Sequence, residues 1–325
     1  MREIYYWQAV NEALAEEMQR DPAVFIMGED VGVYGGAYAV TRGLLEKFGP
    51  ERVRDTAISE AAIVGAGLGA AVTGMRPVVE IMYVDFMGIA MDQLNHQVAK
   101  IRYMFGGKIN MPLVIRAPFG ASGGVAAQHS QSLEAWFYHI PGLKVAVPIT
   151  PYDMKGMLKT AIRDDNPVIF FEHKLSYPIK GEVPEGDYTI PFGKAAIRRE
   201  GSDVTIVSYS LMSIKAQRAA DELTKEGINC EVIDLRSLLP LDHEAIVKSV
   251  SKTHRLVVVQ ESHLRGGVAS DIVAEVIDRA FDNLDAPPVR VGALNVPVPF
   301  NRKLENMVIP NEEKIKKAVY KALGR

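Results

Sequence analysis

The sequence is poor in residues that build covalent or metal cross-links. It has one cysteine, Cys230, among 325 residues. One cysteine forms no disulfide within the chain and no cysteine-rich zinc site, and such a composition is typical of a reducing compartment. The seven histidines show no spacing typical of a metal site. The composition therefore excludes a disulfide-stapled scaffold and a cysteine-rich zinc protein.

Long apolar runs and an excess of basic charge are also missing. The start, Met1 to Tyr6, has no apolar signal core. No run reaches the roughly 18 apolar residues of a membrane span, and the nearest, Ala61 to Met75, is short and rich in glycine. The net charge of −3 indicates no nucleic-acid surface. We therefore expect a soluble cytoplasmic protein that binds neither membrane nor nucleic acid.

The stretch from Arg54 to Met75 is the most informative one present. A polar turn ends at Glu60 and is followed by a run of glycine and alanine. We expect a helix whose missing side chains let backbones approach closely. Glu60 is the only carboxylate at the mouth of this apolar element, and a buried carboxyl is costly unless it is paired. A helix-capping glutamate, favoured by the helix dipole, is the alternative interpretation.

The glycines of this stretch also invite comparison with a dinucleotide-binding loop. Their spacing between Gly65 and Gly69 is Gly-x-Gly-x-Gly, whereas the dinucleotide fingerprint is Gly-x-Gly-x-x-Gly. No apolar strand runs directly into them, because residues 53–59 are mostly polar. The pattern therefore favours close helix packing over a nucleotide loop.

Strands and helices alternate along the rest of the chain. In the first half, apolar runs predict strands at 24–27, 78–82, 113–115, 144–147 and 168–171, and helical periodicity predicts helices at 7–19, 41–48, 86–100 and 150–163. The proline-rich segment 177–192 interrupts this rhythm and is predicted to be a linker. The alternation then resumes. We therefore expect an α/β protein with two doubly wound domains, 1–176 and 193–325, each with a mostly parallel sheet.

Three further places have side chains or backbone groups suited to chemistry. Phe86 follows a predicted strand at the edge where open α/β sheets bind ligands. A loop of small residues ends near His129, whose imidazole can exchange a proton near neutral pH. Residues 161–167 form a helix end whose carbonyls and acidic side chains can hold a hard cation. A core aromatic, a structural histidine and a solvated helix end are the respective alternatives.

Six segments together resemble one enzyme family. They are Gly28 to Val31, Arg54 to Glu60, Gly74 to Glu80, Ala126 to Gln131, Pro141 to Val145 and Ala161 to Pro167. The chain resembles, over essentially its whole length, the β subunit of the thiamine-diphosphate-dependent decarboxylating component of 2-oxo acid dehydrogenase complexes. Ala57 and Ala62 stand where many relatives have proline and glycine, and neither position carries chemistry.

The resemblance implies a transketolase-like pyrimidine-binding domain followed by a transketolase-type C-terminal domain. It implies that Glu60 contacts the aminopyrimidine nitrogen of thiamine diphosphate, that Glu29 also belongs to the cofactor site, and that Phe86 packs on the pyrimidine. A carboxyl at the pyrimidine favours the imino tautomer, whose nitrogen takes the thiazolium proton. The cofactor itself carries out the difficult chemistry, and the protein supplies orientation and electrostatics. Burial would raise the pKa of Glu60 and a helix start would lower it. His129 matches the histidine that faces the substrate.

The resemblance also implies partners and metals. The chain has no Gly-Asp-Gly motif, so the diphosphate and its magnesium are expected on a separate α subunit in an assembly of two α and two β chains. A lipoyl-bearing acyltransferase core would be the next partner. A structural potassium, bound by main-chain carbonyls, is implied at five residues, namely Leu113, Ala161, Ile162, Asp164 and Asn166. The C-terminal lysines could belong to the docking surface or to a solvated helix face.

The implied reaction is decarboxylation of a 2-oxo acid, or cleavage of acetoin, followed by transfer of the acyl group to lipoamide. Residues 81–86 and 130–137 look closer to acetoin or branched-chain members than to pyruvate members. A transketolase-like carboligase half, a non-catalytic scaffold subunit and a nucleotide-binding regulatory domain are the alternatives.

Overall fold

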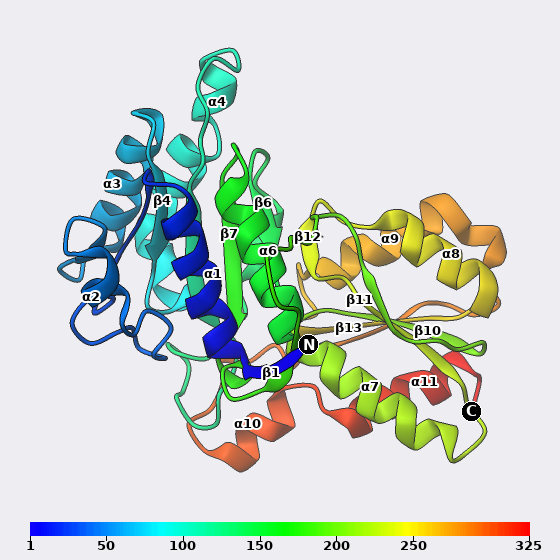
Figure 1. Cartoon of the computed structure of the whole chain (residues 1–325). Helices are drawn as coiled ribbons and strands as arrows, with labels where there is room; N and C mark the ends of the chain where they lie inside the picture. The colour runs from blue at the N-terminus through cyan, green and yellow to red at the C-terminus, as the bar shows by residue number, and fades with distance from the viewer. The chain divides into compact units, whose positions relative to one another are not determined.

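The computed structural model describes residues 1–325, which cluster into two compact units (Figure 1). The first unit contains Met1–Phe119 and Trp136–Phe192, and the second contains Gly120–Ala135 and Gly193–Arg325. The chain therefore passes from one unit to the other at three points. Both units are α/β structures built on mostly parallel sheets, as the sequence predicts. None of the helices has the length and apolar character needed to cross a bilayer.

The first unit is built on a parallel sheet with the order β6-β7-β5-β4-β2-β3. Its strands are β2 (Val24–Gly28), β3 (Val53–Asp55), β4 (Arg76–Glu80), β5 (Val114–Phe119), β6 (Lys144–Ala146) and β7 (Val168–His173). Its helices are α1 (Tyr6–Arg20), α2 (Leu44–Phe48), α3 (Glu60–Val72), α4 (Ile101–Met104), α6 (Pro151–Arg163) and the 3-10 turn η3 (Lys174–Ser176). The short helix α5 (Glu134–Tyr138) begins in residues that belong to the second unit.

The two faces of this sheet are covered by different helices. Val78 belongs to the core shared with α1 and α6. The next residue, Val79, faces α3, because a Cβ built on Gly67 would lie 2.8 Å from Val79 Cγ1. Successive residues of a strand point to opposite faces, so this alternation is expected. The close packing predicted from the glycines is thus confirmed at Gly67, but a Cβ on Gly69 would meet nothing within 4 Å.

The prediction of a single helix at 86–100 is wrong. A 3-10 helix η1 (Val84–Ala90), a π-helix η2 (Gln93–Val98) and the short α4 stand in its place. The spacing of the buried residues explains this. They recur every three residues at Val84, Met87 and Ala90, which suits a 3-10 helix. The next two buried residues, Leu94 and Val98, are four positions apart, which suits the wider turn of the π-helix η2.

The segment 177–192, predicted as a linker, is folded into the first unit. Lys180–Val183 forms β8, which pairs antiparallel with β1 (Arg2–Tyr5). Ile190 is buried against α6, since a Cβ on Gly156 would lie 2.7 Å from Ile190 Cγ1. The prolines prevent a helix here, but the apolar side chains between them still pack on the core. The first unit therefore extends to Phe192.

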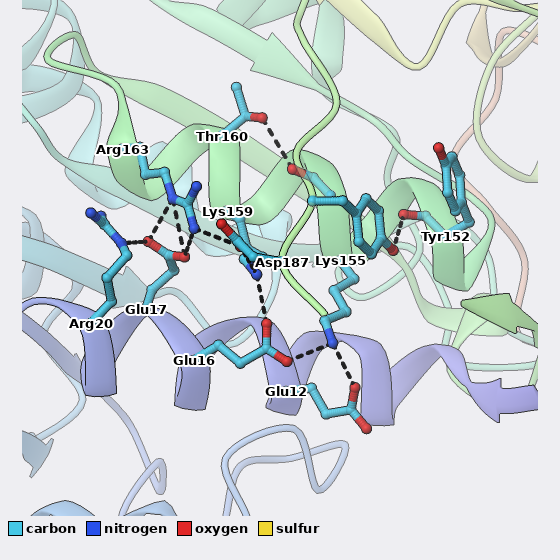
Figure 2. Close-up of polar contacts among 12 residues, drawn as sticks. Glu12, Glu16, Glu17, Arg20, Tyr152, Lys155, Lys159, Thr160, Arg163 and Asp187 are labelled. Carbon is cyan, nitrogen blue, oxygen red and sulfur yellow. Dashed lines mark hydrogen bonds and ion pairs between the residues drawn. The ribbon is translucent and has the colours of Figure 1, made fainter. Parts of the chain in front are cut away.

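Charged side chains join α1 to α6 (Figure 2). Lys155 Nζ lies 2.6 Å from Glu16 Oε1, and Lys159 Nζ lies 2.6 Å from Glu16 Oε2. Both lysines are only 1% exposed. Arg163 Nη2 lies 2.6 Å from Glu17 Oε1, and the Glu17 side chain is fully buried. Because buried charges are costly when unpaired, these contacts fix how the two helices face each other.

The second unit has the sheet order β14-β13-β10-β11-β9, in which only β9 is antiparallel to its neighbour. Helices α8 and α9 lie on one side of this sheet and α7 and α11 on the other (Figure 1). The strands are β9 (Ala196–Arg199), β10 (Val204–Ser208), β11 (Cys230–Asp234), β12 (Ser237–Leu239), β13 (Leu256–His263) and β14 (Val289–Ala293). The helices are α7 (Leu211–Thr224), α8 (His243–Thr253), α9 (Val268–Ala280), η4 (Phe281–Asn283), α10 (Arg302–Val308) and α11 (Glu312–Ala322). The sequence pattern predicted neither β9 nor α10.

Candidate active site

Two buried carboxyl groups, those of Glu29 and Glu60, lie near each other at the carboxyl edge of the first sheet. Glu29 directly follows β2 and is 7% exposed, and Glu60 is the first residue of α3 and is 4% exposed. Burial raises the pKa of Glu29, and the negative charges of Glu60, Asp30 and Glu80 raise it further. Oε1 of Glu29 is buried without a hydrogen-bond partner. This oxygen is therefore ready to bond a group that enters from outside the unit.

Tight backbone packing brings Glu29 to this place. Gly28 pairs with Glu80 on the neighbouring strand, and a Cβ on Gly28 would lie 2.8 Å from the Glu80 carbonyl oxygen. The loop after Glu29 is held by Asp55, whose Oδ1 accepts a hydrogen bond of 2.6 Å from Gly32 N. The backbone N–H of Thr56 donates to the Gly28 carbonyl at 3.0 Å. Residues from three neighbouring strand ends thus fix the position of Glu29.

A buried ion network lies close to Glu29, whose pKa is raised in part by the charge of Glu80. Arg116, on β5, is fully buried and donates from Nη1 to Glu80 Oε2 at 2.7 Å. It also donates from Nε and Nη2 to the two oxygens of Glu172 at 2.6 and 2.9 Å. The Tyr177 hydroxyl donates to Glu172 at 2.9 Å. Burial raises the pKa of Glu80, and the Arg116 charge opposes that rise.

Phe86 lies in η1, which follows β4 by a few residues. Its ring meets Tyr83 edge to face, with centroids 5.8 Å apart. The Lys174 ammonium lies over the Tyr83 ring, 5.1 Å from its centre. Phe86 is half-buried, and η1 places it beyond the carboxyl end of β4. Glu29, Glu60 and Phe86 thus belong to one unit and follow neighbouring strands of it.

His129 belongs to the second unit, within the segment 120–135. Its backbone N–H donates to the Ala126 carbonyl at 3.4 Å, and Ala126 has a left-handed backbone with φ of 62°. The base of the loop is closed by Gly120 N, which donates to the Gln131 carbonyl at 2.9 Å. His129 is half-buried. The loop is therefore a folded turn of the second unit.

The five residues of the predicted potassium site lie around the end of α6 in the first unit. The carbonyl of Ile162 accepts a hydrogen bond of 3.0 Å from Arg76 Nη1, and that of Asp164 accepts one of 3.2 Å from the same nitrogen. The side-chain oxygen of Asn166 accepts from Arg102 Nη1 at 2.9 Å. The carbonyls of Ala161 and Leu113 accept backbone N–H groups. Two guanidinium groups thus already supply positive charge at this helix end.

The geometry fits a planar, nitrogen-rich ring at the carboxyl edge of the first sheet. An aminopyrimidine offers N–H donors, which suit the unpartnered Glu29 oxygen, and a ring nitrogen, which suits a carboxyl such as that of Glu60. No group of three or more His, Cys, Asp or Glu side chains in the chain is arranged to hold a metal ion. The residues present therefore fit the pyrimidine half of thiamine diphosphate.

Sequence reasoning missed the Glu80–Arg116–Glu172 network. A signal was present, because each of these charged residues ends or interrupts an apolar strand, as in the run Val114 to Phe119. A charge inside a fully buried strand needs a partner on a neighbouring strand. The basic C-terminal run is partly explained by contacts inside the unit. Lys316 Nζ lies 2.7 Å from Glu222, and Lys314 Nζ donates to the Met307 carbonyl at 2.6 Å.

Two family models match the chain. Residues 2–180 match the transketolase pyrimidine-binding domain, and residues 193–315 match the transketolase C-terminal domain. Among solved structures, a chain described as "Split gene transketolase, inactive beta4 tetramer" is similar with a TM-score of 0.82 and 25% identity, covering 99% of this chain and 98% of that one.

Three characterised relatives show the closer family. The β subunit of the acetoin:2,6-dichlorophenolindophenol oxidoreductase of Cupriavidus necator is 51% identical, covering 97% of this chain and 96% of the relative. The mitochondrial pyruvate dehydrogenase E1 component subunit beta-2 of Oryza sativa subsp. japonica is 48% identical, covering 100% and 87%. The 2-oxoisovalerate dehydrogenase subunit beta of Bacillus subtilis is 46% identical, covering 97% of each. With both domain models matched in this order, the chain belongs to the E1 β subunits of the 2-oxo acid and acetoin dehydrogenases, a thiamine-diphosphate-dependent family of oxidoreductases with a transketolase-like fold.

Proposed function

We propose that this chain is the β subunit of a pyruvate, acetoin or branched-chain 2-oxo acid dehydrogenase. Together with an α subunit it would decarboxylate a 2-oxo acid, or cleave acetoin, and transfer the acyl group to lipoamide. The observation that supports this proposal best is the buried pair Glu29 and Glu60, with one unpartnered oxygen at the carboxyl edge of the sheet. The pair has the chemistry of a pyrimidine-binding site.

The residues of this chain would bind and orient the cofactor. Thiamine diphosphate, when bound, supplies the carbanion chemistry that the reaction needs. Glu60 would hold the ring nitrogen of the pyrimidine, and Glu29 would accept a hydrogen bond through its unpartnered Oε1. The raised pKa of Glu29 means that this carboxyl keeps its proton to a higher pH than an exposed glutamate does. Phe86 would pack on the pyrimidine, and His129 would face the substrate and move a proton or steer the lipoyl group.

The α subunit would supply what this chain lacks. We expect it to hold the diphosphate through magnesium, in an assembly of two α and two β chains that delivers its product to a lipoyl acyltransferase core. The solved split-gene transketolase is itself described as an inactive β4 tetramer. A bound potassium at the end of α6 remains part of the proposal, at carbonyls that already accept hydrogen bonds.

The test is reconstitution. The chain is co-expressed with an α subunit carrying Gly-Asp-Gly, and reduction of an artificial electron acceptor is followed with thiamine diphosphate and magnesium. Pyruvate, a branched-chain 2-oxo acid and acetoin are compared, each with and without the α subunit. We expect turnover only in the mixture, and the best substrate then identifies the complex. A stable assembly that turns over none of the three would contradict the proposal.

Site variants separate an enzyme subunit from a scaffold. Glu60→Gln keeps the size of the side chain and removes the carboxyl, so turnover of the assembled complex should fall about 100-fold or more if the carboxyl takes part in proton transfer. The control is Glu51→Gln, because the side chain of Glu51 is 89% exposed. Unchanged turnover in Glu60→Gln would favour the scaffold alternative.

A further inference from the structure

The segment 120–135 is held to the rest of the second unit by two carboxylates distant in sequence. Glu305, on α10, is 6% exposed, and its Oε1 and Oε2 accept hydrogen bonds from Gly123 N at 2.9 Å and Gly124 N at 2.6 Å. Glu261, at the end of β13, accepts one of 2.6 Å from Ala121 N. Hydrogen bonds to a charged acceptor are among the stronger ones in proteins. Three backbone N–H groups within four residues are thus fixed by carboxylates.

The two glycines have the backbone that this contact needs. Gly123 and Gly124 have φ values of 90° and 97°, which L side chains rarely adopt. This conformation presents two successive N–H groups to the two oxygens of one carboxylate. Arg302 completes the contact, because its Nε donates to the Gly123 carbonyl at 2.9 Å. Gly123 is therefore held through both its N–H and its carbonyl.

Apolar packing secures only one end of the loop, where Ala121 is buried in a cluster with Ala293, Val298, Val308 and Ile309. Residues 130–133, at the other end, border a cavity of about 260 Å³ that is also lined by residues 261–263, 293 and 295–298. A segment beside a cavity has few neighbouring atoms on that side to resist its movement. Between these two ends, the hydrogen bonds of Glu305 and Glu261 hold the backbone from Ala121 to Gly124, ahead of the turn that leads to His129.

We infer that Glu305 is a positioning residue for His129: α10 orients the histidine loop through the backbone N–H groups of Gly123 and Gly124. This inference rests on the proposed function for the role of His129, but the anchoring itself does not. Glu305 lies 182 positions from Gly123 in sequence, so the C-terminal part of the chain determines the conformation of a loop embedded in its first half. The effect of Glu305 on turnover is therefore exerted through His129.

Hydrogen exchange tests the anchoring without activity. In the assembled complex, Glu305→Gln keeps the side-chain shape and removes the charge, so exchange of the Gly123 and Gly124 N–H groups should become at least about tenfold faster. The matched control is Glu244→Gln, at an exposed glutamate of α8 in the same unit. Unchanged exchange in Glu305→Gln would overturn the inference.

A double-mutant cycle tests the link to His129. A small displacement of a substrate-facing group costs up to about 100-fold in rate, so Glu305→Gln should lower kcat about 10- to 100-fold. In a His129→Ala background the same change should lower kcat no further, because there is no imidazole left to misplace. Equal losses in both backgrounds would overturn the inference and leave Glu305 a stabilising residue only. If His129→Ala alone had no effect, the proposed role of His129 would fail instead, while the exchange result would still decide the anchoring.

Discussion

Arg116 donates a hydrogen bond of 2.7 Å to Glu80 where the arginine is fully buried and the glutamate side chain is 4% exposed. The guanidinium also binds Glu172, so one positive charge serves two buried carboxylates. The negative charge of Glu80 in turn helps to raise the pKa of Glu29, so the network also acts on a neighbouring carboxyl of the candidate site. Such a network is costly without its cation.

Removing that cation should destabilise the chain strongly. In Arg116→Met the buried carboxylates lose their partner, and breaking a buried pair costs about 3–5 kcal/mol. Urea unfolding of the full chain measures the change. The triple variant Arg116→Met, Glu80→Gln, Glu172→Gln is the comparison, because it removes all three charges together and should recover part of the loss. A single variant as stable as the wild type would show that the network contributes little.

Two glycines of α3 should respond to alanine in opposite ways. At Gly67 the new Cβ would lie 2.8 Å from Val79 and 3.1 Å from Leu113, so Gly67→Ala should cost about 1–3 kcal/mol by overpacking. At Gly69 nothing lies within 4 Å, so Gly69→Ala should gain up to about 1 kcal/mol from helix propensity. Denaturant midpoints of the two variants, measured side by side, check this. Equal shifts would contradict the packing of α3 on β4.

The raised pKa of Glu29 predicts a dependence of stability on pH. The unfolded carboxyl ionises at a lower pH than the folded one, so between its ordinary pKa of 4.5 and the raised value the native state binds more protons. The contribution of Glu29 to stability therefore falls as pH rises through that window. Relative to the wild type, Glu29→Gln should become more stable at pH 7 than at pH 4.5. Unfolding at several pH values measures this, with Glu51→Gln as the exposed control expected to show no trend.

The contact between α1 and α6 predicts unequal effects for two arginines that bind the same carboxylate. Arg163 Nη2 and Arg20 Nε lie 2.6 and 2.8 Å from the buried Glu17. Arg163 is the more buried partner and makes three of these hydrogen bonds, so Arg163→Ala should cost about 1–3 kcal/mol. Arg20 is half-exposed, and Arg20→Ala should cost at most about 1 kcal/mol. Thermal unfolding compares them, and a reversed order would contradict this account.

Much of the fold could be predicted because its signals are local. The strands predicted at 24–27 and 168–171 begin where β2 and β7 begin, and the helix predicted at 150–163 is α6, which Thr150 caps by accepting a hydrogen bond from Asp153 N. Apolar periodicity and capping depend on residues within one or two turns. The succession of two doubly wound units followed from that alternation and is confirmed.

The remainder depends on contacts between distant parts of the chain. The prolines of 177–192 indicated a linker, but β8 finds its partner at the very start of the chain. The sequence pointed to His129, yet nothing near it in sequence indicated that Glu305 holds its loop. The buried pair of Arg116 and Glu172 likewise joins strands 56 positions apart. Such partners become apparent only once the strand order is known.

The three crossings between the units limit how the gene for this protein can be cut. A fragment beginning at Gly193 would keep Glu261 and Glu305 but lose the N–H groups of Ala121, Gly123 and Gly124 that they bind. The complementary fragment would carry residues 120–135 with no acceptors for them. A functional exchange of the C-terminal unit with a relative must therefore move two separate pieces of coding sequence, the short one inside the first half and the long one after Phe192.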